Sequence, residues 1–445
     1  MTIDPVFAAQ FAEISAFVAG APRGAEVLFA ELRAERADYV RFDRARVRQA
    51  GTVECSEVTL HLIDAGRQAR FACTLGARRR VRTTLAAALA ALRELIAHAP
   101  ADPFAHWQAQ PGASEHVGHG RLADPREALE VIVEAAGEDD VVGLYAAGPL
   151  VRALAGSPGH RHYHQSVSSS FDFSVQAGGD RAVKDVWWSG DWDARALREA
   201  IGAARGHAQI LRRPVRRIDP GAYRALLSPR AVAELVRLLG WGGFSERAQR
   251  SGQSPLALAR SGQARFHPGF SIVDDAGALA VPRFQSEGFE RPERVPLIEA
   301  GQPAERLVSP RSAREFGLAT NGAGDDERPL APCVAPGTLA APAALAALGT
   351  GLAIADLWYL NFSDRGACRV TGLTRFATLW VEDGEPVAPV ATMRIDDSLY
   401  RLFGDQLLAL GDAALPSPET GTWYGREPGG VRAPAALVGA LRLTL

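Results

Sequence analysis

The first half of the chain alternates between the two-residue hydrophobic period of strands and the longer period of helices. Over residues 53–75, apolar side chains recur at every second position on both sides of an Asp-Ala-Gly turn at 64–66, which predicts a β-hairpin. Residues 81–97 have the period and the alanine-rich composition of a helix. Further strands are predicted over 141–147, 160–176 and 181–188.

Polar residues mark where helices begin. The N-terminal segment reads as an amphipathic helix. Asp124 is placed to cap a helix, with proline at the first helical position and Glu127 able to complete a capping box. Asp193 opens a helix to about residue 210, and Ser228 opens one that Gly240 ends.

The pattern changes near residues 212–223, a stretch of arginines with two prolines and a glycine. From about residue 270 onward it indicates mainly strands and turns. We therefore expect an α+β protein of two domains. Residues 1–211 would form an N-terminal domain of sheet and helices, and residues 212–445 a β-rich C-terminal domain.

The segment 339–360 has 22 residues and one charge, Asp356, yet it does not read as a transmembrane helix. It is mostly alanine and is broken by proline and glycine. It predicts a buried helix to about residue 348, a glycine turn, and a strand over 352–360. The N-terminus carries Asp4 and Glu13 and lacks a basic region, so no signal peptide is expected. We expect a cytoplasmic protein without a membrane partner.

Composition adds two exclusions and one oddity. The net charge of −2 argues against a nucleic-acid partner. The four cysteines have no C-x-x-C spacing, which argues against a disulfide scaffold or zinc ribbon and fits a reducing compartment. Lys184 is the only lysine, and Asn321 and Asn361 are the only asparagines. Codon bias explains this scarcity, although an asparagine kept in such a chain can hold a left-handed turn.

Common catalytic motifs are missing from the sequence. It has no phosphate-binding loop of the G-x-x-x-x-G-K-[ST] type and no G-x-S-x-G elbow. None of the ten histidines is followed by glutamate, so neither HExxH nor HExxxH occurs. This excludes the commonest helix-borne zinc peptidase sites.

Three histidines, His160, His162 and His164, form the densest cluster of metal-binding side chains. On a strand they share one face, and two imidazoles could bind a metal together with a carboxylate such as Asp172 from a neighbouring strand. The alternative is a polar strand face whose histidines form hydrogen bonds or stack. The sequence leaves both open, and we assign no metal site.

Cys368 lies in a polar stretch where Arg365 and Arg369 could lower its pKa and make it a nucleophile. A buried, inert thiol is the alternative. Beside it, a run of aromatic and polar residues suits a groove wall or subunit interface, although core packing explains the aromatics equally well. The candidates for a substrate channel or interface are Trp358, Tyr359, Asn361, Asp364, Arg365 and Arg375.

Ordered motifs in the second half resemble the TldD/PmbA (TldE) family. They begin with DPGAYRALLSPRAVAELVRLL, continue through FQSEGFERPERVPLIEAGQP and SAREFGLATNGAG, and end with the long segment from GTGLAIADLWYLNF to MRIDDSLYRLF. The resemblance covers most of residues 215–445. The N-terminal half fits more loosely, through the hairpin and GLYAAGPLVRALAGSPG.

The resemblance implies a two-domain α+β subunit. Within the family, TldD-type subunits are zinc metallopeptidases that use HExxxH and a later cysteine. They pair with TldE (PmbA) subunits lacking these ligands, and the heterodimer encloses a chamber that trims unfolded peptides, including leader peptides.

When RSGQS at 250–254 is set against the family's Arg-Gly-x-Ser motif, the HExxxH position falls on Arg237–Gly242, which contains no zinc ligand. We therefore expect a TldE-like, non-catalytic subunit, with zinc in a TldD-like partner and an unfolded or precursor peptide as substrate. A stand-alone hydrolase built on the histidine cluster and a non-proteolytic peptide scaffold remain alternatives. The sequence does not identify the substrate peptide. It also leaves open whether the chain forms a homodimer or a heterodimer, and whether the partner is a protease or another amide hydrolase.

Overall fold

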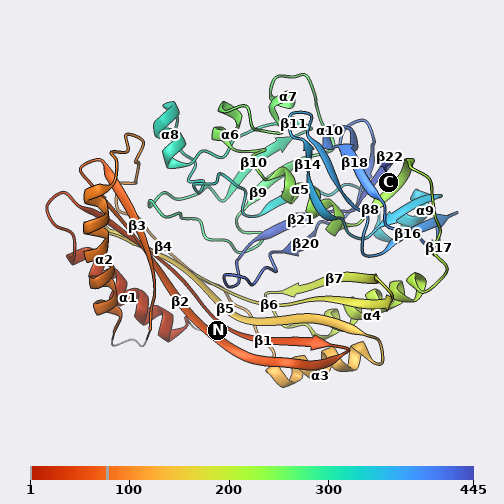
Figure 1. Cartoon of the computed structure of the whole chain (residues 1–445), viewed down its shortest axis with the longest axis horizontal. Helices are drawn as coiled ribbons and strands as arrows, with labels where there is room; N and C mark the ends of the chain where they lie inside the picture. Colours follow the sequence, from red (N-terminus) through yellow and green to blue (C-terminus); the bar gives the residue numbers. More distant parts are fainter. Residues whose placement is uncertain (1–2, 77–79, 445) are drawn as a thin grey trace.

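The computed structural model describes residues 3–76 and 80–444. Within these residues the strands form three sheets, accompanied by helices (Figure 1). The predicted α+β class is therefore confirmed.

The first sheet has seven strands in the described residues, in the order β3-β2-β1-β5-β6-β4, with β7 beside β6. Only β4 pairs in parallel there. The strands are β1 (Val27–Asp43), β2 (Arg46–Asp64), β3 (Arg67–Thr74), β4 (Ala113–Val117), β5 (Val141–Gly156), β6 (His160–Gly178) and β7 (Arg181–Ser189).

Four helices cover one face of this sheet in two pairs (Figure 1). They are α1 (Pro5–Gly20), α2 (Val81–His98), α3 (Pro125–Ala136) and α4 (Ala194–Leu211). Even-numbered residues of β1 face them: Leu28 packs in the α1–α2 core and Phe42 in the α3–α4 core. Odd-numbered Phe29 points to the other face, where it packs in a cluster with Phe284 of the C-terminal half.

The other two sheets lie in the second half of the chain and share one large core. In the described residues the six-stranded sheet has the order β11-β10-β9-β12-β21-β20. Its strands are β9 (Ile272–Asp275), β10 (Arg294–Glu299), β11 (Gln302–Pro303), β12 (Pro332–Val334), β20 (Leu415–Pro418) and β21 (Gly430–Ala433).

The nine-stranded sheet has the order β14-β15-β18-β22-β8-β13-β16-β17 in the described residues, with β19 beside β22. Its strands are β8 (Gly221–Leu227), β13 (Gly351–Ile354), β14 (Trp358–Asp364), β15 (Arg369–Leu373), β16 (Thr378–Glu382), β17 (Glu385–Pro389), β18 (Arg394–Ser398), β19 (Leu407–Leu410) and β22 (Ala436–Leu443). The strand β14 therefore lies at one end of this sheet.

The helices of the second half are short. They are α5 (Pro229–Leu239), α6 (Glu246–Arg250), α7 (Ala257–Arg260), α8 (Pro310–Phe316), a 3₁₀ turn at Ala341–Ala343, α9 (Ala344–Leu348) and α10 (Leu399–Leu402).

The predicted helix starts are confirmed by their capping contacts. The Asp193 carboxylate accepts from the Arg195 amide at 3.0 Å, and the Ser228 hydroxyl accepts from the Ala231 amide at 3.1 Å. The Asp124 carboxylate caps α3 in the same way. Glu127 differs from the predicted capping box, because it accepts from the Trp192 indole at 2.7 Å and so ties α3 to the start of α4.

The predicted hairpin corresponds to β2 and β3, but β2 begins earlier than expected, at Arg46, and also pairs with β1 in a second, longer hairpin. The β2–β3 turn at 64–66 is confirmed, but the strand Val27–Asp43 has no counterpart in the predicted elements. Its sequence is rich in Ala, Glu and Arg, which favour helices when read locally. Pairing with β2 and β5 on either side decides the structure instead.

The segment 339–360 differs from its prediction in two respects. The single expected strand is two, β13 and β14, which lie apart in the nine-stranded sheet with residues 355–357 between them. The helix α9 buries only Ala344 and Leu348, so it is not a fully buried helix. In the described part of the chain, no helix is both long and apolar enough to span a membrane.

Candidate functional site

A hollow of about 430 Å³ lies where α5, β14 and the N-terminal strand β7 meet. We call it the α5 pocket. Segments from four places in the sequence line it: Lys184 and Val186; Arg230, Glu234, Arg237, Leu238 and Trp241; Asp356 to Leu360; and Ser417 to Thr420.

The C-terminal end of α5 and the turn after it form one wall of this pocket, and the HExxxH position is expected here from the sequence, at residues 237–242. Arg237 and Trp241 line the pocket, and the Arg237 guanidinium lies 2.6 Å from the Glu234 carboxylate. Gly242 has a φ of +88°, in the left-handed region. An arginine and a glycine at the two motif ends offer no imidazole, thiolate or carboxylate, so these residues do not fit a zinc ion.

The opposite wall is the start of β14. Trp358 and Tyr359 line the pocket as aromatic neighbours, and Tyr359 is 75% exposed with a φ of +52°. The Lys184 ammonium lies 5.3 Å from the centre of the Trp358 ring and 3.7 Å from the Asp172 carboxylate. Because β14 is an end strand of its sheet, the pocket is flanked by a strand edge.

A buried ion pair lies in the floor of the pocket. The Asp356 carboxylate is 1% exposed and lies 3.0 Å from the Arg230 guanidinium. Burial raises the pKa of Asp356 to about 6, and Arg230 opposes this shift only in part. The charge of Asp356 thus changes closer to neutral pH than that of an ordinary aspartate.

The channel residues predicted from the sequence do not all lie at the α5 pocket. Trp358 and Tyr359 line the α5 pocket, and the Arg365 guanidinium donates to the Trp241 carbonyl at 2.7 Å, joining the end of β14 to the helix end. Asn361 accepts locally from the Phe362 amide at 2.8 Å.

Asn361 and Arg365 are outside the pocket lining, and so are the last two candidates, Asp364 and Arg375. The Asp364 carboxylate accepts from the Ala367 amide at 3.1 Å, closing the turn after β14. Arg375 stacks on Phe376 at 5.1 Å. Their roles as channel or interface residues stay predictions.

The histidine cluster lies on β6, and each ring has its own hydrogen-bond partner. His160 contacts the Gln108 carbonyl, His162 the Ser114 hydroxyl and His164 the Ala280 carbonyl, each at 2.8 Å. Asp172 is on this same strand rather than on a neighbouring one, and it lies beside Lys184. Within the described residues, no group of three or more histidine, cysteine or acidic side chains is arranged to hold a metal ion.

Cys368 is fully buried in the C-terminal core, which favours the inert thiol over the nucleophile. Burial raises its pKa to about 12, and Arg365 opposes the shift only weakly. The thiol is therefore protonated at neutral pH.

Sequence reasoning did not place Lys184, Arg230, Trp241 or Asp356 at the site. Their common position comes from long-range packing between segments as distant as β7 and β14. One signal was available, since Lys184 is the only lysine of the chain and it points into this pocket.

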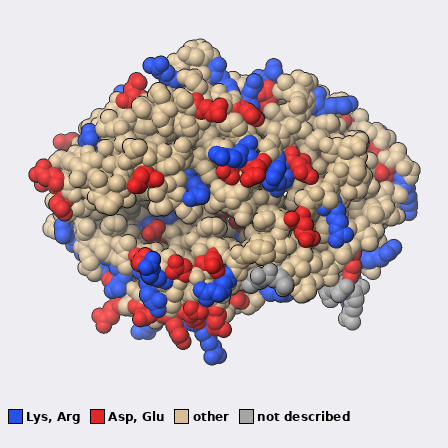
Figure 2. Space-filling model, turned by 180° about the vertical axis from the view of Figure 1, so that it is seen from behind, with Lys and Arg blue, Asp and Glu red and all other residues tan. Residues whose placement is uncertain are grey.

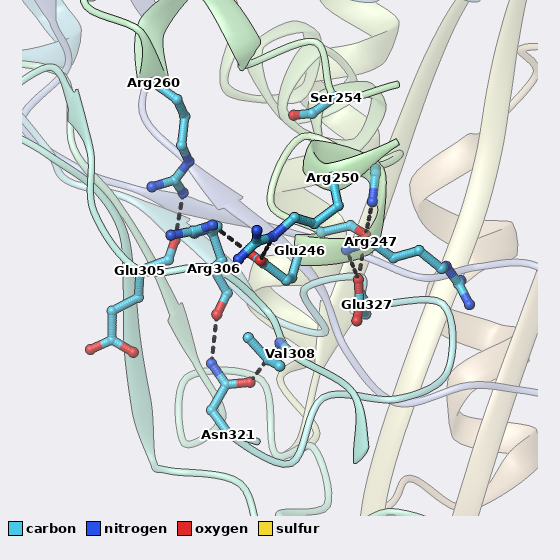
Figure 3. Close-up of polar contacts among 12 residues, drawn as sticks. Glu246, Arg247, Arg250, Ser254, Arg260, Glu305, Arg306, Val308, Asn321 and Glu327 are labelled. Atoms are coloured by element: carbon cyan, nitrogen blue, oxygen red, sulfur yellow. Dashed lines mark hydrogen bonds and ion pairs between the residues drawn. The ribbon is translucent and has the colours of Figure 1, made fainter. Parts of the chain in front are cut away.

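A polar cluster follows the pocket in sequence and fixes the backbone after α5 (Figure 3). Glu246 is fully buried and binds Arg250 at 2.7 Å and Arg306 at 2.5 Å. The Asn321 side chain accepts from the Val308 amide at 2.9 Å and donates to the Arg306 carbonyl at 2.7 Å. Asn321 thus bridges two backbone positions of the segment before α8.

Glu327, also fully buried, joins two helix starts in the same cluster (Figure 3). It accepts from the Ser245 hydroxyl and the Arg247 amide at α6, and from the Ser309 amide and hydroxyl at α8. Burial alone would raise the pKa of Glu327, but these hydrogen bonds outweigh it and hold the pKa below its ordinary value. The cluster therefore holds the starts of α6 and α8 together.

The described chain thus joins a half with one sheet and covering helices to a half with two sheets. The pattern of the PmbA/TldA metallopeptidase C-terminal domain matches residues 220–444. The chain belongs to the PmbA/TldD family. No curated protein sequence matches it.

Solved structures show the same fold over nearly the whole chain at low sequence identity. TldE from Thermococcus kodakarensis matches with a TM-score of 0.79 and 14% identity, covering 98% of this chain and 100% of that one. A proposed modulator of a DNA gyrase from Thermotoga maritima matches at 0.76 and 16%, with the same coverage. One from Bacteroides thetaiotaomicron matches at 0.73 and 15%, covering both chains completely.

Proposed function

We propose that this chain is the TldE-like, non-catalytic subunit of a zinc metalloprotease complex and forms half of its substrate chamber. The observation that carries the proposal is the chemistry of Arg237–Gly242. We place the family's HExxxH motif at these residues. Arg237, Leu238 and Trp241 among them line the α5 pocket, and none of the six residues is a zinc ligand.

The pocket suits an extended, unfolded or precursor peptide. An incoming strand could add to the edge of β14 through main-chain hydrogen bonds, which makes binding tolerant of sequence. Trp358 and Tyr359 offer aromatic contact area for its side chains. A TldD-like partner would supply the zinc ion, which activates water when bound there.

The test is co-expression with an HExxxH-bearing homologue from the same genome, followed by purification through a tag on this chain. We expect the two chains to co-purify and to cut an unstructured peptide, as followed by mass spectrometry. Metal analysis should place zinc in the partner alone. The control is a partner whose HExxxH glutamate is replaced by glutamine, which should assemble without cutting.

Stoichiometric zinc in the isolated chain, or peptide cleavage by it alone, would contradict the proposal. Peptide binding without cleavage by the assembled pair would favour the non-proteolytic scaffold, since the strand edge and aromatic wall serve binding as well as proteolysis.

The four free cysteines are consistent with the cytoplasmic location that we propose for the complex.

A further inference from the structure

The connection between β20 and β21, residues 419–429, extends from the C-terminal half onto the N-terminal sheet (Figure 1). We call it the flap. It borders three spaces: the α5 pocket, a cavity of about 230 Å³, and an outer groove of about 780 Å³. Glu419 and Thr420 line both the α5 pocket and the cavity, while Thr422 and Arg426 line both the cavity and the groove.

Among the side chains that hold the flap to the sheet, Arg426 reaches furthest into it. The Arg426 guanidinium is buried and donates to the Gly148 carbonyl at 3.1 Å, to the Ser168 carbonyl at 2.9 Å and to the Ser168 hydroxyl at 2.5 Å. The β1–β5 ladder is interrupted at Gly148 and Pro149, where proline has no N–H to donate. This interruption leaves the Gly148 carbonyl available to the flap.

Further contacts between the flap and the sheet are also polar. Arg152 of β5 donates to the Arg426 carbonyl at 2.9 Å and to the Glu427 carboxylate at 2.8 Å. The Thr420 hydroxyl donates to the Asp172 carboxylate at 2.9 Å. Hydrogen bonds of this kind exchange with water at small net cost, so such an attachment can open more readily than an apolar core.

The middle of the flap is exposed and its C-terminal end is rich in glycine. Trp423 is 89% exposed and Tyr424 is 91% exposed. Gly425, Gly429 and Gly430 all have positive φ, between +99° and +139°. At Gly430 an added Cβ would lie 2.4 Å from the Ser417 carbonyl oxygen, so only glycine fits that bend.

Beneath the flap, β6 presents small side chains, with Leu144 and Leu150 of β5 beside them. Ser166, Ser168 and Ser170 alternate along β6 and pair with Leu150, Gly148 and Ala146 of β5. The serines line the cavity, and Trp188 forms a wall. These side chains leave room above the backbone for another chain.

We propose that residues 419–429 form a flap latched by Arg426, and that its opening joins the three spaces into one groove that takes an extended peptide along β5 and β6. This inference rests on the proposed function for the kind of ligand. The exposed aromatic pair would then close over the peptide, and the serine floor would contact its backbone.

The test places a reporter thiol under the flap. Ser166 is 8% exposed in the cavity, so Ser166→Cys is accessible only when the flap opens. The full-length variant is treated with a maleimide, and mass spectrometry follows each cysteine separately. Cys368 is fully buried in the C-terminal core and serves as the internal measure of unfolding.

We expect Arg426→Ala to speed labelling at position 166 at least tenfold, with no change at Cys368. Arg426→Lys keeps the charge but loses the forked geometry and should give a smaller increase. Arg432→Ala, on β21 beyond the flap, should leave the rate unchanged. Equal rates at position 166 with and without Arg426 would overturn the latch, as would a parallel rise at Cys368.

A second arm tests the ligand with a 20-residue unstructured peptide that lacks cysteine. In the Ser166→Cys, Arg426→Ala protein, saturating peptide should slow labelling at position 166 at least threefold. Unchanged labelling would overturn the groove as a peptide site. Neither labelling experiment requires the partner subunit. Failure of an HExxxH-bearing partner to co-purify would therefore contradict the proposed function without contradicting the flap.

Discussion

Burial raises the pKa of two acidic side chains of this molecule, Glu327 and Asp356, but their neighbours give the two pKa values opposite net shifts. Glu327 accepts hydrogen bonds at two helix starts and stays charged more readily than a free glutamate. Asp356 has one arginine partner and a large burial penalty, so its pKa rises. Residue type alone predicts neither behaviour, because the difference lies in donors brought from elsewhere in the chain.

The raised pKa of Asp356 has a consequence for stability. Since its pKa moves from 3.8 to about 6, the folded chain holds, between these two pH values, a proton that the unfolded chain has released. This carboxyl therefore stabilises the fold fully below about pH 4, and the contribution is lost as pH rises through 6. We expect Asp356→Asn to flatten this dependence.

Urea unfolding at pH 4 and pH 7.5 measures the effect. The wild type should lose about 2–2.5 kcal/mol relative to Asp356→Asn between these two pH values. Parallel stability profiles for the two proteins would show that Asp356 titrates in the folded chain as it does in water.

Glu327→Gln should destabilise the chain by about 2–4 kcal/mol, because an amide NH₂ would face the donors that now meet a carboxylate oxygen. The loss should show as a lower midpoint in thermal or urea unfolding. The matched control is Glu305→Gln, since the exposed Glu305 side chain points away from the cluster (Figure 3). Equal midpoints for both variants would contradict the role of Glu327.

At the scale of elements, capping and periodicity predicted α2, α4 and α5 well because those signals are local. The same signals predicted one strand over 352–360, where the structure has β13 and β14. Residues 355–357, which separate the two strands, contain neither proline nor glycine to mark the break. The candidate site was therefore predictable only in part. The aromatic pair of β14 was identified, but its meeting with α5 depends on sheet topology.

The strand β14 gives a test of peptide binding. Because Tyr359 is 75% exposed, Tyr359→Ala should leave stability unchanged while weakening binding of an unstructured peptide by about 5–10-fold. Fluorescence anisotropy of the assembled pair with a labelled peptide measures the affinity. Leu408→Ala, an exposed apolar residue on β19, is the control and should bind as the wild type does.

At the scale of the whole molecule, the two halves are tied together by apolar and polar contacts. Ala377 and Leu379 of the second half pack into the α3–α4 core, and Arg426 reaches into the N-terminal sheet. On the face seen in Figure 2, acidic and basic side chains are interspersed. The predicted division near residue 212 stays a prediction, because helix and strand patterns do not report how halves pack.

Separate expression of residues 1–217 and 218–445 in one cell tests this packing. We expect the two pieces to co-purify through a tag on either one, since the shared core and the buried arginines do not depend on the covalent link. Light scattering should give the mass of the intact chain. Recovery of the tagged piece alone would show that the link is needed.

The solitary lysine makes the α5 pocket directly observable by spectroscopy. Reductive methylation with ¹³C-formaldehyde would label only Lys184 and the N-terminal amine, so the NMR spectrum would contain a single side-chain signal. The ring current of Trp358, 5.3 Å away, should shift that signal. Because the chain has a single lysine, one NMR signal would report on peptide binding, partner binding and flap opening at the α5 pocket.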